Sequence, residues 1–311
     1  MQSVALGCKS AVIRQDQSSR MRRALGKWGL WHGLATLVSA GWVGVSRAEG
    51  VLDPQGPIAA AERTLLLNAT AIMLVVIFPV MILTVVFAWW FRASNTRATY
   101  TPNWAHSGRI EFVVWSIPAM VIMLLAAVAW GSAHLLDPAR PLSSDQKPIR
   151  IEVVSLDWKW LFIYPDLGIA TLNQITVPQG TPIEFMLTST NVMNAFWVPQ
   201  LGSMIYTMPG MTTHLNLLAT NAGDFAGFSA NFSGDGFSDM RFTVHAVPSA
   251  GYSSWLEAAR GAAVKLDDAG YAQLAQSGTD VSLRTYGGVM PGLFERIERD
   301  SIGTPMGPGG H

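Results

Sequence analysis

The chain is almost without cysteine: its 311 residues include one, Cys8, in the extreme N-terminal segment. If that segment is removed, no thiol is left for a disulfide, a thiolate metal site or a cysteine nucleophile. Charged residues are also scarce, at 14%, and the formal net charge is zero. There is no basic stripe to follow a phosphate backbone, which argues against a nucleic-acid partner.

Familiar catalytic motifs are absent as well. The sequence has no Gly-x-Ser-x-Gly elbow, no phosphate-binding loop and no metal-binding cysteine pair. Half of the residues are hydrophobic, which is typical of a membrane protein. We therefore expect a membrane component without a catalytic centre of its own.

The first apolar stretch, residues 28–46, follows three basic residues and ends at the small-x-small tripeptide 46–48 that a signal peptidase cuts. We expect residues 1–48 to be a cleaved signal peptide and the mature chain to start near Glu49. An uncleaved anchor helix is the alternative, although its glycines make it a poorer span than the two that follow. A more usual signal sequence begins at Met21, which leaves the true start open.

Two further stretches, residues 65–91 and 112–136, contain no Asp, Glu, Lys or Arg. At ~1.5 Å per residue, each is long enough to cross a hydrocarbon core of about 30 Å, so both are predicted transmembrane helices. The loop between them, residues 92–111, carries three arginines and no acid before Glu111. The positive-inside rule places this loop in the cytoplasm, so residues 49–64 and both mature termini are expected on the periplasmic side.

The pattern then changes to short β-branched or alternating runs separated by turns, which is typical of an all-β sandwich or barrel. We expect this domain over residues 137–247, with its clearest strands at 149–155, 171–177, 183–189, 214–218 and 240–245. A small helical extension is expected over residues 248–300, with helices at 255–264, 268–276 and 291–299. The tail, residues 301–311, has the composition of a disordered segment.

The segment 227–240 has the layout of a metal-binding loop without its metal-binding side chains. Ser229 and Ser233 lie four residues apart, Phe237 follows four residues later, and Met240 comes three after that. A dinuclear copper loop fills this spacing with Cys, Cys, His and Met. Soft thiolates select copper, and a serine hydroxyl does not replace them. The loop is therefore predicted to be kept for its shape.

This loop, together with the stretch 191–200 upstream, resembles subunit II of the haem-copper terminal oxidases. The pattern is similar to the quinol oxidase branch, which takes electrons from a membrane quinol and not from cytochrome c. The stretches 157–160 and 206–211 fit that branch as well. The resemblance implies six degenerate copper-site positions that hold no metal: Asn194, Ser229, Asn231, Ser233, Phe237 and Met240.

The resemblance also implies an architecture and a function. It implies a two-helix membrane hairpin followed by a periplasmic cupredoxin-like Greek-key β-barrel, in a bacterial inner membrane. The complex would be a proton-pumping quinol oxidase, with quinol as its substrate, haems and one copper in the partner subunit I, and further small membrane subunits. This chain would bind no cofactor itself. The quinol type, the haem types and whether this chain lines the quinol site stay open.

Three residues are singled out as candidates for a direct role. By the same resemblance, Glu111 lies at the entrance of the proton channel into subunit I; an ordinary helix-end acid favoured by the helix dipole is the other interpretation. Trp158 and Trp160 are expected to point to the same side of an extended backbone. We expect them to pack against subunit I rather than to conduct electrons.

Two other functions are left open. A cytochrome c oxidase subunit II with a working dinuclear copper site needs thiolates that the mature chain lacks. A membrane-anchored periplasmic copper-handling module is suggested by the methionine-rich loop 204–214, because thioethers and imidazole bind Cu(I). Methionines that fill the core of a loop are the simpler interpretation of the same residues.

Overall fold

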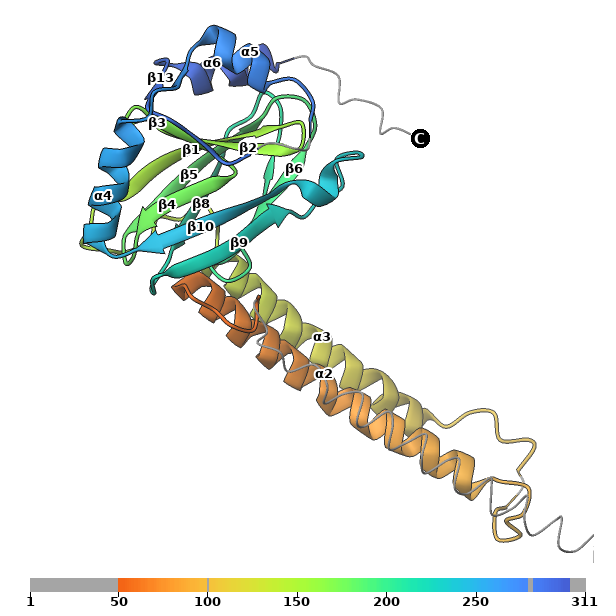
Figure 1. Cartoon of the computed structure of the whole chain (residues 1–311). Coiled ribbons are helices and arrows are strands. Elements are labelled where there is room, and N and C mark those ends of the chain that lie inside the picture. The colour runs from red at the N-terminus through yellow and green to blue at the C-terminus, as the bar shows by residue number, and fades with distance from the viewer. Residues whose placement is uncertain (1–49, 100, 279–281, 303–311) are drawn as a thin grey trace, which may run out of the picture. The chain divides into compact units, whose positions relative to one another are not determined.

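The computed structural model describes three stretches of the chain: residues 50–99, 101–278 and 282–302 (Figure 1). The expected signal peptide, residues 1–48, lies outside these stretches. So does the expected disordered tail, apart from its first two residues.

Two long helices form the first part of the described chain. α2 (Pro57–Trp90) and α3 (Gly108–Leu135) lie side by side in Figure 1. Both are long and apolar enough to cross a membrane. Their large apolar side chains are exposed along most of their length, as expected of surfaces that meet lipid or a partner helix rather than water. The predicted two-helix hairpin is confirmed.

α2 starts earlier than its apolar span. Residues 49–64 were expected as a separate segment before the membrane, but the helix begins at Pro57. Proline fits the first helical position because its fixed φ suits the helix and its missing N–H is not needed there. The first turn is also held by the β-domain, since Ile58 and Ala59 are buried and the Ala59 amide donates to the Leu201 carbonyl at 3.3 Å.

The β-domain consists of a six-stranded sheet in the order β12-β3-β2-β1-β5-β8 and a five-stranded sheet in the order β4-β10-β9-β6-β7. Neighbouring strands are antiparallel except for the pairs β1–β5 and β4–β10, which are parallel. This β-rich, cupredoxin-like architecture agrees with the expectation from the sequence. The strands are β1 (Ile149–Leu156), β2 (Lys159–Tyr164), β3 (Ile169–Leu172), β4 (Gln174–Pro178), β5 (Pro182–Ser189), β6 (Asn194–Trp197), β7 (Ile205–Thr207), β8 (Thr213–Leu218), β9 (Gly223–Ser229), β10 (Arg241–Val247) and β12 (Arg284–Tyr286).

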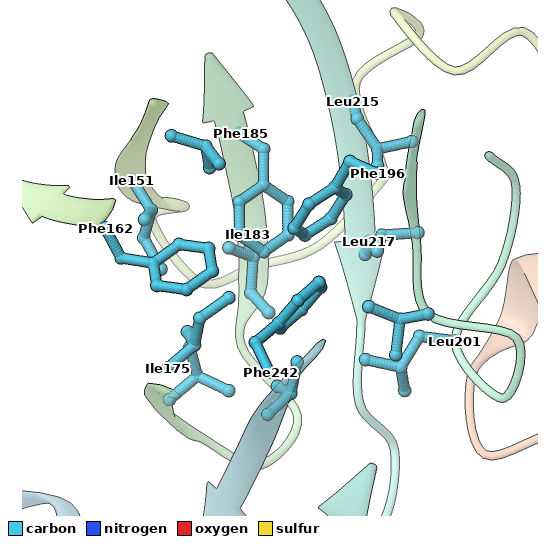
Figure 2. Packing of buried hydrophobic residues seen from close by; sticks show 14 of the residues in the cluster. Ile151, Phe162, Ile175, Ile183, Phe185, Phe196, Leu201, Leu215, Leu217 and Phe242 are labelled. Carbon is cyan, nitrogen blue, oxygen red and sulfur yellow. The ribbon is translucent and has the colours of Figure 1, made fainter. Parts of the chain in front are cut away.

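An aromatic cluster forms the centre of the core, to which strands of both sheets contribute. The ring of Phe196, from β6, stacks on Phe242 from β10 with centroids 4.8 Å apart. Figure 2 shows these two rings beside Phe162 and Phe185 from the six-stranded sheet. Aromatic rings bury large apolar areas, so this cluster contributes much of the driving force for folding.

The prediction of a single strand over residues 171–177 is wrong, because the structure has two strands there. β3 ends at Leu172 in one sheet and β4 begins at Gln174 in the other. Asn173, between them, has φ 56°, a left-handed conformation that asparagine tolerates better than most residues. Its side-chain oxygen accepts a hydrogen bond from the Trp160 amide at 2.8 Å, which fixes the place where the chain changes sheets.

The C-terminal extension is helical, as expected, but it also contains strands. Its elements are α4 (Ser249–Arg260), β11 (Lys265–Leu266), α5 (Asp268–Leu274), β12, β13 (Gly288–Val289) and α6 (Leu293–Asp300). β12 extends the six-stranded sheet beside β3, so the extension is joined to the domain by backbone hydrogen bonds. The extension also packs against the sheet through a second cluster of buried apolar residues, which come from β1, β2, β3 and the extension itself.

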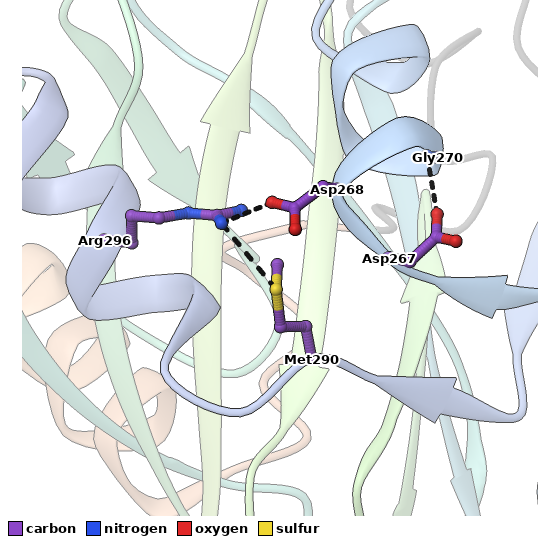
Figure 3. A network of polar contacts seen from close by, with 5 residues as sticks. All are labelled: Asp267, Asp268, Gly270, Met290 and Arg296. Atoms are coloured by element: carbon purple, nitrogen blue, oxygen red, sulfur yellow. Dashed lines mark hydrogen bonds and ion pairs between the residues drawn. The ribbon is translucent and has the colours of Figure 1, made fainter.

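The helix boundaries in the extension are partly corrected. The first helix begins at Ser249 and not at residue 255, because Ser253 and Ser254 bond to carbonyls of the preceding turn instead of capping a helix. The expected cap of α5 is confirmed: the Asp267 carboxylate accepts from the Gly270 amide at 2.8 Å (Figure 3). The third helix begins two residues after Pro291, at Leu293.

Candidate functional site

A buried polar network occupies the first of the degenerate copper positions. Asn194, at the start of β6, is 1% exposed. Its amide nitrogen donates to the Ser155 hydroxyl at 2.6 Å, and its amide oxygen accepts from the Ser229 hydroxyl at 3.2 Å. Both ends of the asparagine side chain are therefore committed to neighbours in the domain, as a buried amide requires.

The rest of the loop converges on this network. The Ser229 amide donates to the Met240 carbonyl at 3.1 Å, and the Asn231 side chain donates to the Met193 carbonyl at 3.4 Å. Met240 is 1% exposed and belongs to the main core. Residues from β6, from the loop before it and from the 229–240 loop thus lie close together.

The outer part of the loop is apolar. Phe237 begins a short 3-10 helix, η1 (Phe237–Asp239), and its ring meets the edge of Phe232 with centroids 5.8 Å apart. Ser233 is anchored through its carbonyl, which accepts from the indole nitrogen of Trp158 at 3.3 Å. The Ser233 hydroxyl is buried without a hydrogen-bond partner among the described residues.

The side chains at these positions do not fit a pair of copper ions. Phe237 has no donor atom, the Asn194 amide and the Ser229 hydroxyl are used in hydrogen bonds, and one thioether remains at Met240. Copper sites of this class depend on thiolate and imidazole. Within the described stretches there is also no group of three or more His, Cys, Asp or Glu residues that would hold another metal.

The two tryptophans expected to face a partner do not share one side of a strand. Trp158 has φ 62° in the turn between β1 and β2, which breaks the alternation on which that expectation depended. Trp160 is fully buried and meets Phe196 and Phe242 edge-on at 5.4 and 5.6 Å. As a core residue, Trp160 has no surface to offer subunit I, so that expectation is wrong for this residue. Trp158 is half-buried and packs over the copper-like loop at Gly234.

Glu111 lies in the first turn of α3, where the helix dipole favours a carboxylate. One of its oxygens is 2.6 Å from Nδ1 of His106, in the loop that precedes the helix. Both side chains are exposed, at 51% and 70% respectively. This contact joins the first turn of α3 to the loop before it.

The sequence analysis did not predict two residues that take part in these contacts. Ser155 lies 39 positions from Asn194, and no local pattern connects them. The contact of His106 is weakly indicated by the sequence, because a histidine five residues before an acid at the start of a helix is close enough to bond to that acid. Neither contact follows from spacing alone.

The comparison with family models assigns the β-domain. The model described as "Cytochrome C oxidase subunit II, periplasmic domain" matches residues 166–247. Together with the two apolar helices and the loop geometry, this match defines the class of the protein: it is an oxidase subunit II with a membrane hairpin and a cupredoxin-like domain. These features fit a protein of the inner membrane.

Curated relatives narrow the class. The cytochrome bo(3) ubiquinol oxidase subunit 2 of Pseudomonas aeruginosa is 48% identical over 247 residues, which cover 79% of this chain and 75% of the relative. The ubiquinol oxidase subunit 2 of Acetobacter aceti is 46% identical over 249 residues, covering 79% and 81%. The quinol oxidase subunit 2 of Bacillus cereus is 37% identical over 236 residues, covering 76% and 81%. The chain belongs to the subunit 2 family of the quinol oxidases.

Proposed function

We propose that this chain is the non-catalytic second subunit of a proton-pumping quinol oxidase of the aerobic respiratory chain. The complex oxidises two quinols to two quinones and passes the four electrons to O2, which takes up four protons to form two waters. The haems and one copper reside in a partner subunit I, beside further small membrane subunits. This chain supplies the membrane hairpin and the periplasmic domain that packs on that partner.

The observation that carries the proposal is the polar network at the copper-like positions. Asn194, Ser155 and Ser229 satisfy one another's hydrogen bonds in a buried place, so the loop keeps its shape without a metal. A subunit built in this way has no electron-accepting centre for cytochrome c. Electrons therefore enter the complex from quinol at the membrane.

We propose that the loop connecting the two helices lies in the cytoplasm. Arg92, Arg97 and Arg109 lie between or just inside the two helices, and the positive-inside rule supports this orientation. The β-domain and both termini of the mature chain are then periplasmic. This orientation puts the Glu111–His106 pair on the side from which protons for oxygen reduction are taken.

Glu111 is the proposed proton entrance. A proton-collecting group needs contact with water and a titratable partner, and Glu111 has both in its exposed contact with His106. The carboxylate passes protons toward subunit I, and the histidine beside it collects them from the cytoplasm.

The proposed function is tested by the choice of electron donor. The complex purified in mild detergent through a tag on this chain is expected to contain a haem-bearing partner and to consume O2 with a soluble ubiquinol. Reduced cytochrome c is expected to give a rate no higher than a blank without enzyme. Oxidation of cytochrome c at a rate comparable to that of quinol would overturn the proposal. A chain that purifies alone with bound Cu(I) would support the copper-handling alternative instead.

A further inference from the structure

An open pocket of about 520 Å³ lies in the loop that joins the end of α2 to the start of α3 (Figure 1). Phe91 and Arg92 line it where the helix ends, and Asn95, Thr99 and Thr101 line it further along the loop. The remaining lining comes from two alanines, whose small side chains leave the space open. None of these residues belongs to the copper-like loop or to the proposed proton entrance.

The pocket lies at the depth of the lipid headgroups. The apolar span of α2 ends at Phe91, so Arg92 is the first charged residue after it. Three tryptophans near this end of the hairpin are exposed: Trp89, Trp90 and Trp104. Indole rings gather at the boundary between membrane and water, where the ring meets apolar chains and its N–H meets polar groups. Lipid headgroups are therefore the ligands nearest to this pocket.

The Arg92 guanidinium is already held in place. Its central carbon lies 4.7 Å from the centroid of the Trp89 ring, its Nη1 donates to the Trp89 carbonyl at 2.9 Å, and its Nε donates to the Ser94 hydroxyl at 3.0 Å. A guanidinium has more N–H donors than these two contacts use, and no other described residue accepts from them. A fixed guanidinium with spare donors is a common partner of phosphate oxygens.

No carboxylate neutralises this part of the chain. The loop also carries Arg97 and Arg109, and it contains no Asp or Glu before Glu111. The Glu111 carboxylate is in contact with His106 at 2.6 Å, not with an arginine. Basic residues beside a membrane span attract anionic lipids. Because no acid lines the pocket, it has no partner for the amine of a zwitterionic headgroup.

Hydroxyl groups complete the pocket. Thr99 and Thr101 are exposed, and their side chains make no hydrogen bond to the described residues. Asn95 fixes the turn that leads to them, because its amide nitrogen donates to the Trp90 carbonyl at 2.5 Å and its oxygen accepts from the Arg97 amide at 3.2 Å. The pocket thus presents one guanidinium and two hydroxyls, which match the phosphate and glycerol oxygens of a headgroup.

We propose that this pocket binds the headgroup of an anionic phospholipid of the phosphatidylglycerol type. Arg92 binds the phosphate, the hydroxyls of Thr99 and Thr101 bind phosphate or glycerol oxygens, and the exposed ring of Phe91 lies against the first part of an acyl chain. The bound lipid fixes the loop between the two helices to the membrane surface. The site goes beyond the proposed function and does not depend on the electron donor of the complex.

The test uses the whole oxidase in nanodiscs of phosphatidylcholine. A small share of the lipid is phosphatidylglycerol with a photoreactive diazirine on the first carbons of one acyl chain. After illumination, mass spectrometry of peptides measures how much of the segment 91–101 carries lipid, normalised to haem. An Arg92→Gln exchange is expected to lower this label about tenfold or more, because it removes a charge-assisted contact with phosphate. The double variant Thr99→Val with Thr101→Val keeps the charge and is expected to lower the label about threefold.

Arg109→Gln is the matched control, because it removes the same charge from a residue that does not line the pocket. It is expected to lower the label less than about twofold, since a more distant charge acts only through a screened field. Added unlabelled phosphatidylglycerol is expected to displace the label, whereas phosphatidylethanolamine and inorganic phosphate are not. The proposal is overturned if Arg92→Gln and Arg109→Gln lose label equally, or if either of the last two probes displaces it as well as phosphatidylglycerol does. If Arg92→Gln does not assemble, unchanged labelling of the threonine variant overturns it.

Discussion

An Asn194→Leu variant is expected to lose about 1–3 kcal/mol of unfolding free energy. Leucine has the same number and branching of side-chain heavy atoms as asparagine, so the substitution removes hydrogen bonds without opening a cavity. It leaves the Ser155 hydroxyl without its 2.6 Å donor and removes the nearer of the two acceptors of the Ser229 hydroxyl, at 3.2 Å. Both serines are buried, so water does not replace the lost partner, and the full cost of desolvation remains.

The loss is measured by urea unfolding of the β-domain in the detergent-solubilised chain, followed by tryptophan fluorescence. Asn221→Leu is the matched control, because this asparagine is exposed and its hydrogen bond to Gln55 is exposed to solvent. The control is expected to change stability by no more than about 0.5 kcal/mol. Equal losses in the two variants would show that the network at the copper-like positions does not stabilise the loop.

A Glu111→Gln exchange is expected to lower quinol-dependent O2 consumption by about tenfold or more at saturating quinol, since a positioned acid–base group contributes that much or more to proton transfer. Glutamine keeps the size and the hydrogen bond to His106 but carries no titratable proton. The KM for quinol should not change, because Glu111 lies in the loop-proximal turn of α3 and is proposed to move protons, not to bind substrate.

Two measurements check this effect. Turnover is recorded with a soluble ubiquinol, and proton uptake is recorded in proteoliposomes with the cytoplasmic face outward. Glu257→Gln, on the periplasmic extension in the proposed orientation, should match the wild type in both. If Glu111→Gln also matches it, the carboxylate is an ordinary helix-end acid.

The membrane helices were predictable because their signal is local. Each span depends on an uninterrupted apolar run, and tertiary contacts do not alter that requirement. The first two turns of α2 were missed because they are polar enough to resemble a loop, and contacts with the β-domain hold them. Helix ends determined by tertiary contacts are not visible in composition.

β2 shows why part of the sheet escaped sequence reasoning. On one face Trp160, Phe162 and Tyr164 join the main core, and on the other Leu161 and Ile163 join the cluster under the extension. A strand buried on both faces shows no alternation, so its pattern resembles any apolar run. Trp160 was misplaced for the same reason, because a tryptophan in such a strand is a core residue.

The spacing of the 229–240 loop could be read from the sequence, but the hydrogen-bond partners of its residues could not. Four- and three-residue intervals predict that Ser229 and Met240 belong to one loop, and the structure brings them within hydrogen-bond contact of each other's backbone. The polar network at Asn194 includes Ser155, which belongs to a different strand, β1. Contacts between distant strands need the fold before they can be seen.

The central claim is that the loop at the copper-site positions is held by hydrogen bonds and apolar packing, without a metal. The most direct test is the copper content per complex, measured by mass spectrometry of the metal against quantitative amino-acid analysis of the purified oxidase. The account predicts one copper per complex, all of it in the partner subunit. Three coppers per complex, with the extra pair lost on replacing Met240 by leucine, would contradict it.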